Sequence, residues 1–308
     1  MIERRIFGLR YYITTEEPNI NSCDKFFVIP IVNKSGVRAY YVEIGGLSEL
    51  ELITRLTIRS IKRERVRDIA VQFYIPPDDF RQKTRVVGIS HGDLSIKKDS
   101  MGNFIANLVI DVIPPGRREV IYVAQKLSLK PFKVSDTDWG LIEDSPIKYT
   151  HRGRLQSVNR PEIVKLANML RGNNIYESVL RCVTFIKKHV RYHRNRYRLG
   201  CMFALKHGKG ACDEITDLCA SILKAMGIRT RTIIGYVIGG SFHAWIEVST
   251  NRHGWVPIDA TAGMIGGIGA RWIKFFTEPK PGAKILNVSS RGKISAKLEY
   301  MLESEKLM

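Results

Sequence analysis

Apolar residues at helical spacing mark one long helix in the second half of the chain. After Cys212 they recur every three or four positions, which predicts a helix with a single buried stripe. The stripe consists of Ile215, Leu218, Cys219, Ile222, Leu223 and Met226. Gly227 is placed to end this helix. Upstream, Pro161 begins another predicted helix that Gly172 ends, and a further helix spans about residues 176–191.

Runs of alternating and β-branched residues predict strands before these helices. They cover residues 5–13, 25–32, 37–44, 69–75, 104–113 and 119–129, and a turn at 99–103 predicts a hairpin. A series of this kind is typical of a β-sandwich. Residues 49–56 stay open between strand and helix, because Ser48 could cap a short helix there.

Strands are also predicted after the helices. Residues 231–238, 241–248 and 254–261 predict neighbouring antiparallel strands, and residues 293–302 alternate as a final strand would. Glycines dominate residues 263–269, which predicts a flexible connection.

These elements predict an α+β fold with two domains, which a chain of 308 residues is long enough to build. Residues 1–135 form an N-terminal β-sandwich-like domain, and the polar stretch 136–155 is a linker. Residues 156–308 form a second domain with helices, an antiparallel sheet and a C-terminal β tail.

The formal net charge of +19 is unusual, and part of it is concentrated just before the Cys212 helix. This basic cluster comprises Lys187, Lys188, Arg191, Arg194, Arg196 and Arg198, interleaved with Tyr192 and Tyr197. Such a patch can hold phosphates and offer rings for stacking, so nucleic acid or a ribonucleoprotein is one candidate partner. An acidic substrate is another candidate. The plain alternative is a solvated surface, since charge by itself argues for solubility rather than function.

Other features of the composition narrow the class of protein. None of the five cysteines forms a CxxC pair, which fits a reducing compartment better than a disulfide framework. The chain lacks an apolar signal core and an apolar run of membrane-spanning length, so we expect a cytoplasmic protein without membrane contact. No ligand spacing indicates a metal, and no cofactor is expected.

A thiol, an imidazole and a carboxylate occur in an order that suits nucleophilic catalysis. Cys212 opens its helix after Gly210 and Ala211, where the unpaired N–H groups and the helix dipole favour a thiolate and can hold an oxyanion. His243 falls on the polar face of one predicted strand, and Asp259 on the next strand. Each residue alone is more often structural. Together they predict a Cys-His-Asp site.

The surrounding residues carry a family resemblance. The segments 210–212, 225–231, 235–236, 243–245 and 254–259 resemble the transglutaminase-like superfamily, over roughly residues 156–262. The resemblance implies a papain-like α+β core with a cysteine helix packed on an antiparallel sheet. It implies that Cys212 is the nucleophile, His243 the general base and acid, and Asp259 the orienting carboxylate. The expected substrate or oxyanion neighbourhood consists of Gly210, Ala211, Trp245 and Tyr236.

Two departures favour the microbial and archaeal-type members of that superfamily. Animal transglutaminases hold the oxyanion with an upstream tryptophan, whereas this chain has none between Trp139 and Cys212. No acidic loop indicates calcium activation either. We therefore expect a cysteine-dependent amide hydrolase that acts on peptides or proteins through an acyl-enzyme. The alternatives are acyl transfer to amines, peptide deglycosylation, and a nucleic-acid or ribosome-associated protein that uses the fold as a scaffold.

Overall fold

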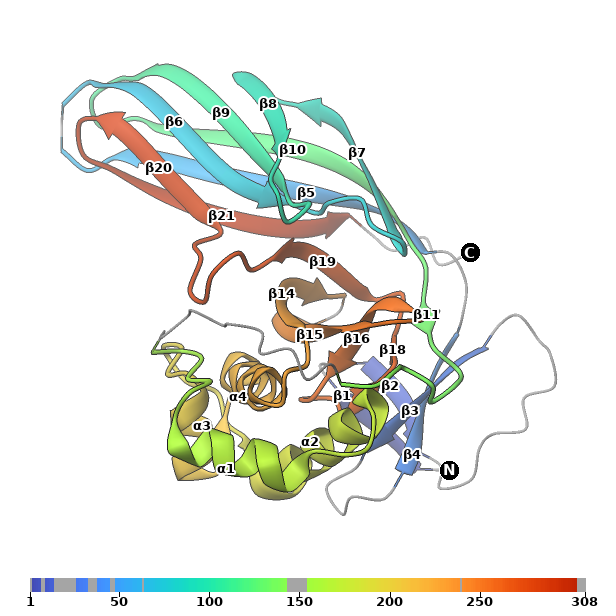
Figure 1. Ribbon diagram of the computed structural model, residues 1–308. Coiled ribbons are helices and arrows are strands. Elements are labelled where there is room, and N and C mark those ends of the chain that lie inside the picture. Colours follow the sequence, from blue (N-terminus) through green and yellow to red (C-terminus); the bar gives the residue numbers. More distant parts are fainter. Residues whose placement is uncertain are drawn as a thin grey trace. The chain divides into compact units, whose positions relative to one another are not determined.

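A computed structural model describes residues 2–6, 9–13, 26–32, 38–44, 48–62, 64–142, 154–238 and 240–303 (Figure 1). Residue contacts group the chain into two units, each built from separate segments. The core unit contains Met1–Gly46, Pro131–Trp272 and Thr277–Gly282, and the sandwich unit contains Leu47–Lys130, Ile273–Phe276 and Ala283–Met308.

The sandwich unit consists of two four-stranded antiparallel sheets. One has the order β21-β5-β10-β7, with bounds Ile294–Glu303, Ser48–Ser60, Arg118–Leu129 and Gln82–Ile89. The other has the order β20-β6-β9-β8, with bounds Leu286–Arg291, Val66–Ile75, Phe104–Ile113 and Asp93–Lys98. Buried and exposed positions alternate along β6, and its inward residues share one apolar core with those of β5, β9 and β10.

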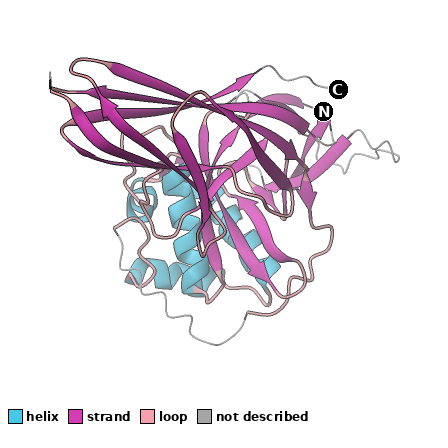
Figure 2. Cartoon of the chain, turned by 90° about the horizontal axis from the view of Figure 1, so that it is seen from above, coloured by secondary structure: helices cyan, strands magenta, loops and turns pink. Residues whose placement is uncertain are grey.

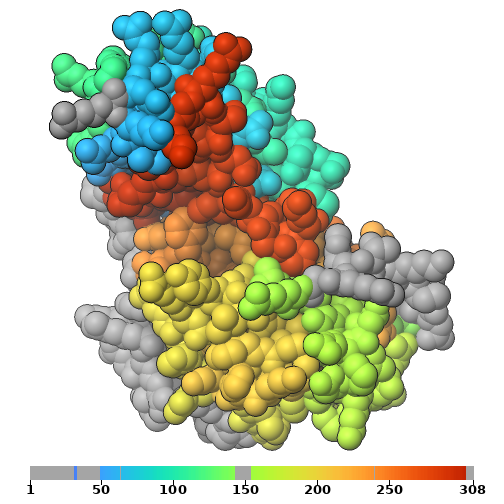
Figure 3. All heavy atoms as spheres, turned by 90° about the vertical axis from the view of Figure 1, so that its left-hand side faces the viewer, coloured from blue at the N-terminus to red at the C-terminus, as the bar shows by residue number. Residues whose placement is uncertain are grey.

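The core unit places helices against an antiparallel sheet. The helices are α1 (Pro161–Leu170), α2 (Ile175–His189), α3 (Cys201–His207) and α4 (Cys212–Ala225). They lie together in Figure 2, in cyan. In Figure 3 the green and yellow surface belongs to the helical part of this unit. Asn174 caps α2 by accepting the N–H of Glu177 at 2.8 Å, and Gly208 ends α3 with φ of 60°.

The sheet of the core unit follows the order β14-β15-β16-β17-β3-β4. Its strands are Thr230–Val237, Phe242–Thr250, Gly254–Asp259, Met264–Ile265, Phe26–Val32 and Arg38–Ile44 in that order. Strand β19 (Trp272–Thr277) is divided, because its residues Ile273–Phe276 group with the sandwich unit. Short two-stranded pairs complete the unit: β1 (Ile2–Ile6) with β2 (Leu9–Ile13), β11 (Phe132–Lys133) with β18 (Gly267–Ile268), and β12 (Arg191–Tyr192) with β13 (Lys209–Gly210).

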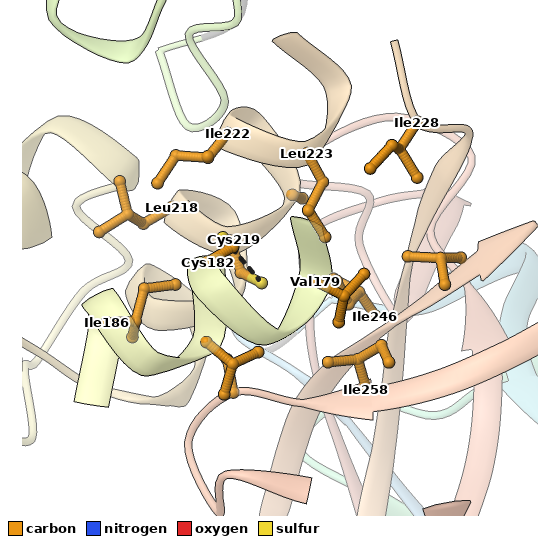
Figure 4. Packing of buried hydrophobic residues seen from close by; sticks show 14 of the residues in the cluster. Val179, Cys182, Ile186, Leu218, Cys219, Ile222, Leu223, Ile228, Ile246 and Ile258 are labelled. Carbon is orange, nitrogen blue, oxygen red and sulfur yellow. Dashed lines mark hydrogen bonds between the residues drawn. The ribbon is translucent and has the colours of Figure 1, made fainter. Parts of the chain in front are cut away.

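Helix α4 is the centre of the apolar core because it packs on α1, α2, β14 and β15. Its buried stripe faces α2 and the strands β15 and β16, so that Cys219 lies 3.9 Å from Cys182, sulfur to sulfur. Figure 4 shows this packing with Ile246 and Ile258 on the strand side. The helical spacing predicted from the sequence is confirmed here, and the first residue of α4 is Cys212.

The structure confirms the α+β class and the largely antiparallel sheets. The division of the chain differs from the predicted one. Strand β3 pairs with β17 inside the core sheet, and the tail strands β20 and β21 pair with β6 and β5 in the sandwich. Sequence periodicity shows that a strand exists but does not show its partner, which explains the difference.

Three local expectations are also corrected. Residues 49–56 belong to strand β5 and not to a helix. The stretch 263–269 is buried and carries β17 and β18, and Gly263, with φ of +82°, is required because a Cβ would lie 2.3 Å from the Val32 oxygen. Of the predicted linker, Trp139 is buried against Tyr176, and residues 143–153 lie outside the described residues.

Candidate active site

Cys212 is presented by the first turn of α4. Its side chain is partly exposed, and in the described part of the chain the other cysteines (Cys182, Cys201 and Cys219) are buried thiols. The N–H groups of a first helical turn have no acceptor inside the helix and carry partial positive charge. The thiol therefore lies beside donors that can hold a negative charge next to it.

Glu214 organises the approach to this turn. Its carboxylate is fully buried and accepts the N–H of Ala211 at 2.8 Å. A Cβ on Gly210 would lie 2.8 Å from the Cβ of Glu214, so only glycine fits this position. The predicted requirement for a small residue before the cysteine thus has a specific cause, which is the side chain of Glu214.

His243 and Asp259 meet because β15 and β16 pair in antiparallel register, with Ile246 opposite Ile258. His243 Nε2 lies 2.7 Å from Asp259 Oδ2, and both side chains are buried. The other oxygen, Oδ1, accepts the N–H groups of Thr261 and Ala262, each at 3.0 Å. The indole of Trp272 donates to Oδ2 at 3.2 Å. The carboxylate is therefore held in one orientation from both sides.

The electrostatics of the pair favour a charged imidazole. Burial alone would lower the pKa of His243, but the Asp259 carboxylate, followed by the interaction with Cys212, raises it to about 10. Burial would raise the pKa of Asp259, but His243, the Ala262 N–H and the Trp272 indole lower it. Cys212 is among the groups whose interaction raises the pKa of His243, so the thiol and the imidazole lie close enough to interact. Nε2 is the ring nitrogen that is engaged by Asp259. The three predicted residues are brought together.

The predicted neighbourhood residues differ in their placement. Ala211 is the residue before α4 and is 9% exposed. Trp245 is 1% exposed and packs in a core cluster with Ile233, its ring 6.2 Å from that of His243. The predicted polar face of this strand is not exposed, because both faces of β15 are buried. Tyr236 is partly exposed, and its ring stands edge-on to the ring of Phe242, with the ring centroids 5.8 Å apart. Phe242 is the residue directly before His243 in the chain.

The basic cluster separates into engaged and exposed members. Lys187 donates to the Thr261 oxygen at 2.8 Å, in the segment that also caps Asp259. Arg198 bridges Asp217 and Glu278 with hydrogen bonds of 2.6–3.1 Å, and these carboxylates raise its pKa although burial opposes them. The side chains that remain exposed are Lys188, Arg191, Arg194 and Arg196. The six residues therefore do not form a single open patch.

Two supporting residues were missed at the level of sequence. Glu214 stands three positions after the N-cap residue Ala211, where a glutamate commonly caps the start of a helix, and this spacing could have revealed it. Trp272 left no local signal, because only the tertiary fold brings it to Asp259. Among the described residues no group of three or more His, Cys, Asp and Glu is placed to hold a metal ion. Nor does any helix within the described ranges have the length and apolar character to cross a membrane.

Comparisons with known proteins agree with this geometry. Residues 165–260 match the model of a family described as the transglutaminase-like superfamily. That range contains Cys212, His243 and Asp259 together with the helix and strands that carry them. The predicted resemblance is confirmed, and this part of the chain is a transglutaminase-like core.

Solved structures extend the similarity of the fold. A candidate cysteine protease from Cytophaga hutchinsonii is 14% identical, with a TM-score of 0.59 over 85% of this chain and 93% of that one. The periplasmic domain of TgpA from Pseudomonas aeruginosa is 17% identical, with a TM-score of 0.35 over 70% of this chain and 91% of that one. No curated protein matches the chain. The chain thus shares its fold with the candidate cysteine protease.

Proposed function

We propose that the protein is a cysteine-dependent amide hydrolase that cleaves peptide or protein substrates through a covalent acyl-enzyme. The observation that carries this proposal is the convergence of three side chains: a partly exposed thiol at a helix N-terminus, a buried imidazole whose pKa that thiol helps to raise, and a carboxylate oxygen 2.7 Å from the imidazole Nε2. Thiol, base and orienting acid in this relation are the components of nucleophilic acyl transfer.

In the proposed mechanism, Cys212 Sγ attacks the carbonyl carbon of the amide. The N–H groups of the first turn of α4 stabilise the oxyanion that forms. The imidazolium of His243 then donates its proton to the leaving amine, and the C–N bond breaks to give a thioester. His243, now neutral, takes a proton from water, and the hydroxide attacks the thioester, so that the C–S bond breaks, the acid leaves and the thiolate–imidazolium pair is restored. Asp259 keeps the ring oriented and stabilises its charge throughout.

Water is the proposed acceptor of the acyl group, because the chain lacks the tryptophan that animal transglutaminases have upstream of their catalytic cysteine. The same acyl-enzyme could also transfer its acyl group to an amine. Incubation of a peptide library with and without methylamine, followed by mass spectrometry, separates the two reactions. Free carboxyl products in both samples support the hydrolase, and methylamide products as the main species would replace it with an acyltransferase.

Selective labelling tests whether Cys212 is an activated nucleophile. Iodoacetamide at pH 7 should label Cys212 stoichiometrically in the folded protein and leave Cys219 unlabelled, since Cys219 is buried in the α4 core. Cys212→Ala serves as the blank, and Cys219→Ala is the matched control that should retain both labelling and activity. Equal labelling of the two thiols would contradict the proposal.

A further inference from the structure

The loop of residues 193–199, which leads from β12 to α3, is fastened to the turn that presents Cys212. The N–H of His193 donates to the Gly210 oxygen at 2.8 Å. Asn195 Nδ2 and the N–H of Leu199 donate to the two carboxylate oxygens of Glu214, each at 2.7 Å. Gly210 and Glu214 flank Cys212 by two residues on either side. His193 and Asn195, the two chain neighbours of Arg194, are therefore hydrogen-bonded to residues that flank the Cys212 thiol.

The far end of the loop is fixed as firmly. Arg198 forms a bidentate pair with the buried Asp217 of α4 and a second pair with Glu278. Gln156 donates to the same Asp217 at 3.1 Å. With ion pairs at one end and hydrogen bonds to the catalytic turn at the other, the loop is a rigid support for the side chain that it projects.

Arg194 is that projecting side chain. It is exposed, and within the described residues no carboxylate forms an ion pair with it. Burial and then the charge of Cys212 raise the pKa of the Tyr192 hydroxyl, and the charge of Arg194 opposes them. The charges of Cys212 and Arg194 thus both shift the pKa of the same hydroxyl, so both groups lie near it. The Tyr192 side chain that carries this hydroxyl is 49% exposed. Tyr192 lies opposite Gly210 in the β12–β13 pair, so this face of the loop adjoins the catalytic turn.

We propose that Arg194 is a specificity-determining residue that favours substrates with a carboxylate close to the amide attacked by Cys212. The inference rests on the proposed thiol chemistry and names an acidic peptide as the substrate class. Binding of a nucleic acid along the whole basic cluster is less well supported than binding of an acidic peptide. Arg198 is paired with two carboxylates, and Lys187 is hydrogen-bonded to a backbone carbonyl.

Two small thiol reagents test this without a known substrate. Iodoacetate carries a carboxylate and iodoacetamide does not, so the ratio of their rate constants at Cys212 reports the local preference for an anion. Arg194→Ala should lower the ratio about two- to fivefold, the effect of one exposed charge pair. Arg194→Glu should lower it by roughly the square of that factor because two charges change, and added salt should narrow the differences. The iodoacetamide rate should stay the same.

Arg229→Ala is the matched control, since Arg229 is exposed and follows the opposite end of the 14-residue helix α4. At 1.5 Å per residue that end is about 20 Å from Cys212. The ratio should be unchanged in this variant. An unchanged ratio in both Arg194 variants would overturn the inference. So would a loss of binding to a single-stranded RNA in those variants without any change in the ratio.

A peptide pair then separates this inference from the proposed function. Two quenched fluorescent libraries, one with Asp and Glu and the other with Asn and Gln at the variable positions, should differ in kcat/KM in favour of the acidic one. Arg194→Ala should remove that preference. Cleavage of both libraries with equal efficiency would overturn the inference but leave the hydrolase in place. If neither library is cleaved but the ratio of the iodoacetate and iodoacetamide rate constants changes as expected, the proposed hydrolase function would be overturned. The preference of the Cys212 site for an anion would then still stand.

Discussion

Replacement of Asp259 by asparagine should change the charge of His243 while preserving the shape of the site. The neighbouring N–H groups of Thr261 and Ala262 can still donate to the amide oxygen, so the side chain keeps two of its hydrogen bonds. What is lost is the negative charge 2.7 Å from His243 Nε2. Burial of the imidazole remains and disfavours its protonated form, and only the weaker interaction with Cys212 still opposes it.

The size of the effect follows from two independent estimates. The pKa of His243 is raised from 6.5 to about 10, a difference of about 3.5 that corresponds to roughly 5 kcal/mol at about 1.36 kcal/mol per pKa unit. Two unit charges 2.7 Å apart interact by roughly 6 kcal/mol at an effective dielectric constant of about 20. The Asp259 charge is thus large enough to be the main cause of the rise, to which Cys212 also contributes and which burial opposes. We therefore expect the pKa of His243 to fall well below 10 in Asp259→Asn.

Histidine-selective NMR titration measures this directly, and the alkylation rate of Cys212 against pH provides a second measurement. With a neutral imidazole the thiolate loses its partner, so alkylation at pH 6 should slow at least about tenfold and peptide hydrolysis should fall by about 10²–10⁴. Trp272→Phe is the control, since it removes only the neutral donor at 3.2 Å and should leave the His243 pKa high. A His243 that still titrates near pH 10 in Asp259→Asn would refute this account of the site.

The same pair predicts how stability depends on pH. The pKa of His243 is higher in the folded state, so its contribution is fully present below about pH 6.5 and is lost as the pH rises towards about 10. The pKa of Asp259 is lowered by folding, so its contribution is present above about pH 3.8 and is lost as the pH falls below that value. The difference in free energy of unfolding between the wild type and Asp259→Asn should therefore be largest between about pH 4 and 6.5. A difference that is constant from pH 4 to 10 would contradict the assignment.

Two further substitutions test the support of the catalytic turn. Arg198→Leu leaves Asp217 buried without its main partner, so urea denaturation should show a loss of about 3 kcal/mol in the free energy of unfolding; the exposed Arg229→Leu should change it by less than about 0.5 kcal/mol. Gly210→Ala should cost about 1–3 kcal/mol and slow the alkylation of Cys212, because the new Cβ would collide with Glu214. A fully stable and active Gly210→Ala protein would show that the first turn of α4 can shift without consequence.

The sequence was most informative where a pattern has only one local explanation. The apolar stripe after Cys212 specifies a helix of the observed length, and the glycine before it indicates a close approach of the chain. The order of thiol, imidazole and carboxylate predicted a site whose three side chains the structure brings together. These features depend on neighbours a few residues away, which is the range over which periodicity and capping act.

The partners of strands and of charges were decided only by the tertiary structure. Residues 293–302 alternate as a final strand in the sequence, but the pairing of β21 with β5 depends on which apolar faces meet. Arg198 looks like any other member of the basic cluster, yet it is paired with both Asp217 and Glu278, whereas Arg194 four residues earlier remains exposed. Composition determines how much charge the chain carries. Which of those charges are neutralised, and which remain beside the thiol to meet a substrate, depends on contacts between residues up to 80 positions apart.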